Sequence, residues 1–334
     1  MNHTGEVLPS MMAPPLVTAK DLIKDFDIGG GFLKGSGKPL RAIANVSLEI
    51  QQGEVLGVVG ESGSGKSTLG RLLLRLIEPT AGEVRFDGQD LSGMPPRELR
   101  KFRRHMQMIF QDPYASLNPR MTIGDALMEP ICLHQGLSMA DAEEAAAALL
   151  EQVGLTREHL RRYPRAFSGG QRQRVAIARA LASQPRFIVA DEPVSSLDVS
   201  IQAEVINLLQ DLQRDLQLSL LFISHDLSVV EILADRVMVL YLGRVMEIAP
   251  TDTLYARPAH PYTVALMQAA PGASRSGNRL ILSGEIPSPR NPPSGCVFRT
   301  RCPFAIKDCA DGRPPLRKVG EGHFTACIRD DLAL

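Results

Sequence analysis

Several features are scarce in this chain of 334 residues: tryptophan is absent, and no long apolar run occurs. A membrane-spanning helix needs roughly 20 consecutive apolar residues, and the longest apolar stretches, such as residues 218–223, are far shorter. A net charge is also missing, because 37 basic residues balance 37 acidic ones. Without an excess of positive charge, the surface has no general attraction for nucleic acid or anionic lipid. We therefore expect neither a membrane-crossing segment nor a nucleic-acid partner.

The N-terminal residues lack the pattern of a secretory signal peptide. No basic residue precedes Lys20, and Glu6 and three prolines interrupt the segment, whereas a signal peptide has a basic start followed by an apolar stretch. We expect residues 1–15 to be a flexible lead-in and the chain to remain in the cytoplasm. Thiols stay reduced there, so the five cysteines are expected to be free, metal-bound or catalytic rather than disulfide-bonded.

The apolar residues fall into short runs bounded by glycine and polar turns, which is typical of buried strands. These runs are residues 42–50, 55–59, 84–86, 107–110, 187–190, 218–223 and 237–242. Helical patterns lie between several of them, so the sequence predicts an α/β fold with a largely parallel buried sheet. A helical insertion is expected between about residues 112 and 185, where Ser138 and Asp141 predict the start of an Ala-rich helix that Gly154 ends.

The composition changes after about residue 257, where prolines become frequent and four of the five cysteines follow. Such a change indicates a boundary between two structural units. The sequence thus predicts a main nucleotide-binding domain at residues 16–257 and a small, irregular Cys/Pro-rich module at residues 258–334.

A glycine-rich loop follows the apolar run at residues 55–59 and precedes a helical pattern at residues 69–76. The loop matches the phosphate-binding pattern G-x-x-x-x-G-K-[ST] in its required place between a strand and a helix. Its backbone N–H groups and the helix N-terminus attract phosphates, its lysine reaches the terminal phosphates, and its serine hydroxyl binds magnesium. The predicted ATP-binding residues are Gly60, Glu61, Ser62, Gly63, Ser64, Gly65, Lys66, Ser67 and Thr68.

Two carboxylates, Asp191 and Glu192, end the apolar run at residues 187–190. In α/β sheets the ligand binds at the carboxyl ends of the strands, so both side chains are expected beside the nucleotide. Asp191 is predicted to hold the magnesium shell, and Glu192 to orient and deprotonate the attacking water. By itself an apolar run that ends in Asp-Glu is a common strand terminus. Because the chain also has a phosphate loop, the two carboxylates are the expected partners of that loop.

A second glycine-rich turn, with Ser168, Gly169, Gly170 and Gln171, precedes a helical pattern at residues 175–181. A helix N-terminus of this kind binds anions. One nucleotide needs only one phosphate loop, so this turn is predicted to serve a nucleotide held by another subunit. In isolation the segment would equally fit an ordinary capped helix.

The order of these motifs resembles the ATP-binding cassette (ABC) family. Besides the phosphate loop, the serine-glycine turn and the Asp-Glu pair, the matching segments contain Gln111, Asp198 and His225. They cover about residues 16–250, each in the family's sequence order. The resemblance implies a P-loop ATPase fold with a helical subdomain.

The same resemblance implies roles for individual residues. Two cassettes would pack head to tail, so that ATP lies between Lys66 of one subunit and Ser168 of the other, with Asp198 also at the nucleotide. Gln111 would contact magnesium and signal to membrane subunits, and His225 would stabilise the γ-phosphate and the attacking water. For the aromatic ring that stacks on adenine we choose Phe26, with Phe32 as the rival.

Three further segments are similar to the ATPase subunits of oligopeptide and dipeptide permeases: residues 110–121, 260–262 and 291–296. They extend the match over nearly the whole chain. The implied assembly contains a second ABC ATPase, more often a related chain than an identical copy, two transmembrane permease subunits and, indirectly, an extracytoplasmic peptide-binding protein. The chain would then lie peripherally at the cytoplasmic face of the inner membrane.

Four cysteines, Cys296, Cys302, Cys309 and Cys327, gather in the C-terminal module. Their spacing is not the C-x-x-C pair of a zinc ribbon. Permease ATPases that this chain resembles carry a four-iron, four-sulfur cluster at such a quartet, which is the assignment we adopt. Zinc, with His323 as an alternative ligand, is the runner-up. Four free thiols packing a small core are a third reading, disfavoured because so small a module has little core of its own.

The predicted function is therefore ATP hydrolysis that powers peptide uptake by a binding-protein-dependent importer, with ATP and Mg²⁺ as cofactors. The competing class is a cytosolic cassette ATPase that acts on nucleic acid or ribosomes. Against that class, the chain has a single cassette, no long coiled-coil pattern and no basic excess. A purely regulatory nucleotide-binding protein is disfavoured because Glu192 and the other catalytic positions are all present.

Overall fold

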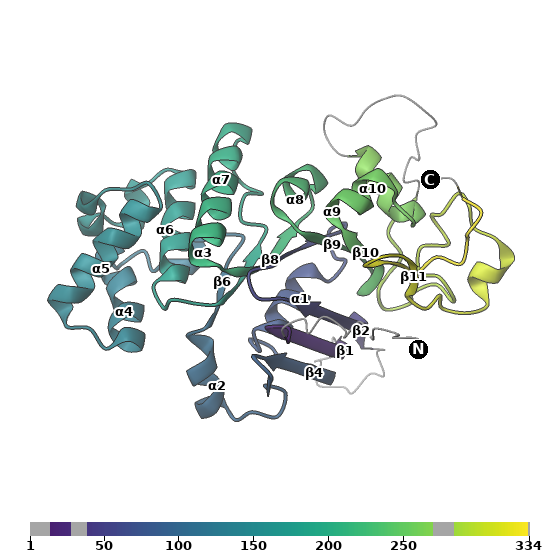
Figure 1. The fold of residues 1–334 in the computed structure, drawn as a ribbon, viewed down its shortest axis with the longest axis horizontal. Coiled ribbons are helices and arrows are strands. Elements are labelled where there is room, and N and C mark those ends of the chain that lie inside the picture. The colour runs from purple at the N-terminus through teal and green to yellow at the C-terminus, as the bar shows by residue number, and fades with distance from the viewer. Residues whose placement is uncertain (1–13, 28–38, 270–283, 333–334) are drawn as a thin grey trace, which may run out of the picture.

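The computed structural model describes residues 14–27, 39–269 and 284–332 (Figure 1). Two sheets and a helical part make up the described chain. Phe32 and residues 1–13 of the predicted lead-in lie outside the described residues.

The larger sheet has eight strands in the order β11-β12-β10-β9-β3-β8-β7-β6. Its parallel part, from β9 to β6, consists of Arg236–Tyr241 (β9), Val55–Val59 (β3), Ser219–Ser224 (β8), Phe187–Asp191 (β7) and Met106–Ile109 (β6). Every residue of β3, β7 and β8 is buried. This explains why their sequences are continuous apolar runs, because a parallel sheet is covered on both faces.

The smaller sheet is antiparallel and has the order β2-β1-β4-β5, with strands Leu40–Ile50 (β2), Val17–Phe26 (β1), Ala81–Phe86 (β4) and Gln89–Asp90 (β5). The runs at residues 42–50 and 84–86 therefore lie outside the parallel sheet, which corrects the expectation that they belong to it. The reason is visible in β2, where Val46, Leu48 and Ile50 are buried and the residues between them are exposed. Such alternation is typical of a sheet with one solvated face.

Between the two sheets lies α1 (Lys66–Leu73), whose buried Leu69, Leu72 and Leu73 pack in one cluster with Val46 and Leu48. Figure 1 shows α1 beside β1 and β2 and below the larger sheet. The remaining helices around the sheets are Pro96–Arg103 (α2), Val199–Leu216 (α7), Leu227–Leu233 (α8), Thr251–Ala256 (α9) and Pro261–Ala269 (α10).

Helices also form the part of the chain where the sequence predicted an insertion. They are Pro113–Ser116 (α3), Ile123–Gln135 (α4), Met139–Gln152 (α5), the 3-10 turns Arg157–Arg161 (η1) and Pro164–Ala166 (η2), and Gly169–Leu181 (α6). The predicted start of α5 is confirmed, because Ser138 Oγ accepts a hydrogen bond from the N–H of Asp141. Its end is confirmed too, since Gly154 follows with a φ of 74°.

The C-terminal residues return to the larger sheet. Strands Arg317–Gly320 (β11) and His323–Thr325 (β12) pair with each other, and β12 pairs with Arg244–Pro250 (β10), which continues the sheet from β9. A 3-10 turn, Lys307–Ala310 (η3), lies in the otherwise irregular stretch before β11. Backbone hydrogen bonds thus join the C-terminal residues to the larger sheet.

Glu247 on β10 joins these parts and is fully buried. Its carboxylate accepts hydrogen bonds from the backbone N–H groups of Ala259 and His260, at 2.6 and 3.0 Å, and from Thr263 Oγ1 at 2.5 Å. His323 Nε2 on β12 lies 2.7 Å from Oε1 of the same carboxylate, the oxygen that also accepts from Ala259. A buried carboxylate is tolerated when its oxygens are satisfied in this way, and here the network fixes the start of α10 against the sheet.

Among the described residues, no helix is both long and apolar enough to cross a membrane.

Candidate nucleotide-binding and hydrolysis site

The phosphate loop connects β3 to α1, and its glycines are required by the fold. A Cβ on Gly60 would lie 2.1 Å from the carbonyl oxygen of Leu240, and one on Gly65 would lie 2.5 Å from that of Ala42. Both residues also have a positive φ, which favours glycine. The loop ends at the N-terminus of α1, where the helix dipole attracts anions.

Lys66, the first residue of α1, points back into the loop. Its Nζ donates hydrogen bonds to the carbonyl oxygens of Gly60 and Glu61, at 2.7 and 3.1 Å. The side chain is only 5% exposed, and this burial lowers the pKa of Lys66. Its ammonium lies 4.0 Å from a carboxylate oxygen of Glu192. The lysine therefore joins the phosphate loop to the end of β7.

Ser67 and Asp191, which the sequence predicts to bind magnesium, contact each other. Ser67 Oγ donates a hydrogen bond of 2.7 Å to Asp191 Oδ1, and burial raises the pKa of Asp191. Mg²⁺ is a hard cation that prefers hydroxyl, carboxylate and water oxygens. The two oxygens lie next to each other at the phosphate-loop end of the sheet, so their chemistry and position fit that ion.

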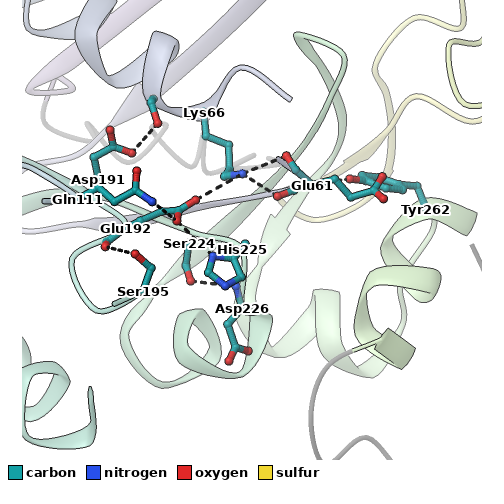
Figure 2. A network of polar contacts seen from close by, with 12 residues as sticks. Glu61, Lys66, Gln111, Asp191, Glu192, Ser195, Ser224, His225, Asp226 and Tyr262 are labelled. Carbon is teal, nitrogen blue, oxygen red and sulfur yellow. Dashed lines mark hydrogen bonds and ion pairs between the residues drawn. The ribbon is translucent and has the colours of Figure 1, made fainter. Parts of the chain in front are cut away.

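Glu192 is the centre of the polar network in Figure 2. Its Oε2 accepts a hydrogen bond from Gln111 Nε2 at 3.1 Å and lies 3.3 Å from His225 Nδ1. The backbone of Glu192 has a φ of 46°, in the left-handed region that a side chain rarely adopts. Gln111, Glu192 and His225 follow β6, β7 and β8, three adjacent parallel strands whose carboxyl ends meet at one edge of the sheet.

The predicted second anion site lies at the N-terminus of α6, and its polar groups bond with one another. Ser168 Oγ accepts from the N–H of Gln171, and Gln171 Oε1 accepts from the N–H of Ser168, at 3.3 and 3.1 Å. Ser168 and Gly169 are exposed, and neither Ser168 nor Gln171 has a polar contact with Lys66 or Glu192 of the same chain. Asp198, just before α7, is exposed as well.

The aromatic side chain chosen for adenine stacking, Phe26, ends β1. It is 37% exposed, and Lys24 Nζ lies 5.0 Å from the centre of its ring. The ring is thus available on the surface, at the carboxyl end of β1, which is an inner strand of the antiparallel sheet. The structure shows no contact that joins it to the phosphate loop.

Two residues that sequence reasoning missed also touch the phosphate loop. Tyr262 Oη accepts a hydrogen bond from the N–H of Glu61 at 2.9 Å, and Arg301 forms an ion pair with the carboxylate of Glu61. Tyr262 belongs to residues 260–262, which the sequence analysis used only for the resemblance to permease ATPases. Nothing in the sequence distinguishes Arg301 from the other arginines. No local pattern in the sequence connects either residue to a loop more than 200 positions away.

The four C-terminal cysteines form no disulfide with any described residue and line one cavity. Backbone N–H groups two residues further along the chain point at three of the sulfurs, from Phe298 to Cys296, from Phe304 to Cys302 and from Arg329 to Cys327. Burial raises the pKa of Cys302 to about 11.

His323, named above as an alternative zinc ligand, is instead held by Glu247. Within the described residues, no three His, Cys, Asp or Glu side chains are placed so that they could hold a single metal ion.

A further cavity, of about 370 Å³, lies between the helical part and the larger sheet. Its walls come from β6, α4 and α6 and include Met108, Phe110, Leu133 and Ala176. Leu133 is 58% exposed, and the charged residues Arg103, Glu129 and Arg179 line the cavity as well.

Two family models match the chain. An ABC transporter model covers residues 43–195, and a model of the oligopeptide/dipeptide transporter C-terminal region covers residues 246–309. A Brucella ovis protein named for ATP binding in peptide import is 57% identical over 324 residues, which is 96% of this chain and 100% of the relative. This chain belongs to the ATP-binding subunits of peptide ABC importers.

Other similarities agree with this family. The oligopeptide transport ATP-binding protein AppF of Bacillus subtilis is 48% identical over 317 residues, 93% of this chain and 96% of the relative. Among solved structures, the dimeric ATP-binding cassette MJ0796 bound to ADP and Pi has a TM-score of 0.63 and 31% identity, over 70% of this chain and 98% of that one. The peptide-importer subunit is thus an ABC-type ATPase, and the competing class of nucleic-acid or ribosome ATPases has no support here.

Proposed function

We propose that this peptide-importer ATPase hydrolyses ATP with Glu192 as the general base. The observation that carries this proposal is the convergence of Lys66, Gln111 and His225 on the Glu192 carboxylate. A carboxylate between a cation, an amide and an imidazole can orient a water molecule and accept its proton as the γ-phosphate leaves. In this arrangement Lys66 binds the terminal phosphates, and His225 stabilises the γ-phosphate and the attacking water.

Magnesium would be held by Ser67 and Asp191, with Gln111 at the edge of its shell, and when bound it would neutralise charge on the phosphates. The proton of Ser67 now donated to Asp191 would be free to turn away, because a carboxylate and a hydroxyl can both direct lone pairs at a cation. We assign Gly60, Glu61, Ser62, Gly63, Ser64, Gly65 and Thr68 to phosphate binding, and Phe26 to adenine stacking.

The serine-glycine turn is proposed to complete the site of a second subunit. Ser168, Gly169, Gly170 and Gln171 present a helix N-terminus to solvent, away from their own chain's phosphate loop, and Asp198 is exposed nearby in the sequence. Two cassettes packed head to tail would bring such a turn onto the partner's γ-phosphate. The dimeric ADP-bound relative supports this arrangement. We propose a related ATPase, rather than an identical copy, as the partner.

We propose that the 370 Å³ cavity between β6, α4 and α6 receives a segment of a transmembrane permease subunit. The cavity begins beside Gln111, since Phe110 lines it, so occupancy could move the Gln111 side chain relative to Glu192. The proposed importer also contains two permease subunits and an extracytoplasmic binding protein, and its cargo is a peptide. In this assembly the chain lies at the cytoplasmic face of the inner membrane.

In the C-terminal region we propose a boundary at residue 257 and a four-iron, four-sulfur cluster on Cys296, Cys302, Cys309 and Cys327. The shared cavity and the backbone N–H groups aimed at three sulfurs support it, because such hydrogen bonds stabilise thiolates bound to a cluster. Iron and sulfide analysis of anaerobically purified protein, with Cys302→Ser for comparison, tests this assignment. Zinc, or no metal, would remove the cluster from the proposal.

The hydrolysis mechanism is tested with Glu192→Gln, which keeps the size of the side chain and one acceptor oxygen but cannot accept a proton. We expect ATP hydrolysis to fall by roughly 10²–10⁴-fold while ATP still binds. Steady-state phosphate release and equilibrium ATP binding measure the two effects. Hydrolysis at the parent rate would show that Glu192 is not the base.

A further inference from the structure

Glu61, the second residue of the phosphate loop, uses all of its polar groups in contacts. Its carbonyl oxygen accepts from Lys66 Nζ at 3.1 Å, which is a contact inside the loop. Its N–H donates to Tyr262 Oη at 2.9 Å, and its carboxylate accepts from Arg301 Nη1 and Nη2 at 2.6 and 3.0 Å. The loop is therefore held at this position by the region that follows the main domain, as Figure 2 shows for Tyr262.

The ion pair between Arg301 and Glu61 has the geometry of a strong one. The Arg301 side chain is 5% exposed and that of Glu61 is 21% exposed, so water screens their attraction little. Two parallel N–H···O bonds also fix the orientation of the carboxylate, which a single contact would not do. Removing either partner would leave the other charge largely buried without a counter-charge.

Arg301 and Tyr262 are themselves rigidly placed. The rings of Tyr241, Tyr262 and Phe298 contact one another, with centroids 4.8, 5.5 and 5.2 Å apart. Arg301 lies beside this cluster, with its guanidinium carbon 5.9 Å from the centre of the Tyr241 ring. Side chains packed in this way lose little further entropy when they bind another group, so they can determine where Glu61 lies.

The position of Glu61 matters because the loop binds phosphate through its backbone. Gly60 and Gly63, on either side of Glu61 and Ser62, have positive φ values and are conformationally free. Because these glycines allow several loop conformations, the backbone N–H groups converge on a phosphate only if other residues fix the conformation of the loop. Lys66 contributes to this through two hydrogen bonds to loop carbonyl groups, and the third N–H of its ammonium is left for a phosphate.

We propose that Arg301 and Tyr262 are positioning residues for nucleotide binding: they hold Glu61, and with it the phosphate loop, in the conformation that receives phosphate. The C-terminal region then forms part of the ATP site of its own chain. This inference rests on the assignment of residues 60–68 to nucleotide binding. It adds that these residues need the contacts of Arg301 and Tyr262 to bind nucleotide fully.

The test is equilibrium binding of ADP to the full-length chain carrying Arg301→Gln, Glu61→Gln, or both. Each single variant breaks the same ion pair, so we expect each to weaken ADP binding about tenfold, which corresponds to about 1.4 kcal/mol. The double variant leaves no unpaired buried charge and is expected to bind no more weakly than either single one. Arg301→Lys keeps the charge but not the paired geometry, and should lose about threefold.

Arg299→Gln is the matched control, because Arg299 lies two residues away and, among the described residues, its side chain bonds to the carbonyl oxygen and the Oγ of Ser294 and not to the phosphate loop. We expect parent-like ADP affinity from it. General unfolding of the region by Arg301→Gln would also remove the partners of Glu61, so it is recognised separately, by a loss of the cooperative urea transition that Arg299→Gln retains.

Parent-like affinity of Arg301→Gln, or independent effects of the two single substitutions, would overturn the inference. Lys66→Ala shows whether the inference about Arg301 has failed or whether the assignment of the nucleotide site itself is wrong. If Lys66→Ala abolishes ADP binding while Arg301→Gln does not weaken it, the loop binds nucleotide without help from the C-terminal region. If Lys66→Ala binds ADP normally, the loop assignment is wrong and the inference falls with it.

Discussion

The two glycine-rich helix N-termini of this ATPase differ in what surrounds them. The one at Lys66 is enclosed by its own chain, with Asp191 and Glu192 on one side and Tyr262 and Arg301 on the other. At the other helix N-terminus, Ser168 and Gln171 form the capping hydrogen bonds with each other, and the turn faces solvent. The same local motif is therefore a nearly complete phosphate site in one place and, by our proposal, half of a shared site in the other.

Ser168→Arg should have the largest effect on this comparison. A large cation at the exposed turn would block the partner's nucleotide, so we expect at least about a hundredfold loss of hydrolysis, as when a preorganised donor at the transition state is removed. ATP binding by the substituted chain should be retained, because its own phosphate loop is untouched. Loss of binding together with hydrolysis would contradict the division between an own site and a shared one.

Gly65→Ala should weaken nucleotide binding strongly, since its Cβ would meet the Ala42 carbonyl oxygen at 2.5 Å and its φ of 105° is strained for alanine. We expect a cost of about 1–3 kcal/mol, seen as weaker ADP binding. Gly63→Ala is the control: its φ is also positive, but nothing lies within 4 Å of the added atom. Equal effects of the two substitutions would show that crowding at Gly65 is unimportant.

Gly170→Ala tests how closely α7 packs against the serine-glycine turn. The added Cβ would lie 2.5 Å from Ile201 Cγ2 on α7, whereas at Gly169 the nearest atom, Leu197 Cδ2, is 3.4 Å away. We expect a loss of about 1 kcal/mol in unfolding free energy for Gly170→Ala, because a side-chain neighbour can shift, and less for Gly169→Ala. Urea denaturation measures both. ADP affinity should not change in either variant, in contrast to Gly65→Ala.

The smallest predicted effect concerns pH and the segment that supports the phosphate loop. Burial lowers the pKa of His260 to about 3, and its Nδ1 accepts a hydrogen bond from the N–H of Tyr262. The unfolded chain, with a pKa near 6.5, binds this proton first as the pH falls, so stability is lost below that value. We expect a loss of about 0.8 kcal/mol between pH 8 and pH 6 from this group.

Urea denaturation at the two pH values measures the effect, and His260→Asn provides the control. The asparagine side chain can still accept a hydrogen bond but does not titrate, so the pH dependence should decrease by that amount. An unchanged pH dependence in the variant would assign the effect to other groups.

Much of the site was predictable because its chemistry is written in contiguous residues. The phosphate loop needs its lysine and glycines at fixed positions between a strand and a helix, and the order of residues 55–76 meets that requirement. The carboxylates 191 and 192 follow an apolar run, so their place at a strand end also follows from the sequence. Their convergence with Gln111 and His225 required the family resemblance, because strand order is not a local property.

The assignment of strands to sheets was predicted less well. The runs at residues 42–50 and 84–86 were placed in the parallel sheet, yet they pair antiparallel with β1 in a separate one. Both kinds of strand contain the same apolar residue types. The alternation of apolar and polar residues from Val46 to Ile50 was nevertheless a signal in the sequence, which the prediction did not use. Partner choice depends on which faces the rest of the chain covers.

The sequence by itself determined the strand, loop and helix that bind phosphate, the carboxylates beside them and the four cysteines in the C-terminal region. Only the tertiary structure decided that Arg301 and Tyr262 hold Glu61 and that β12 extends the main sheet. The physical reason is distance along the chain. A helix cap or a phosphate loop draws on neighbours in sequence, whereas an ion pair across 240 residues forms only where the folded chain brings its two charges together.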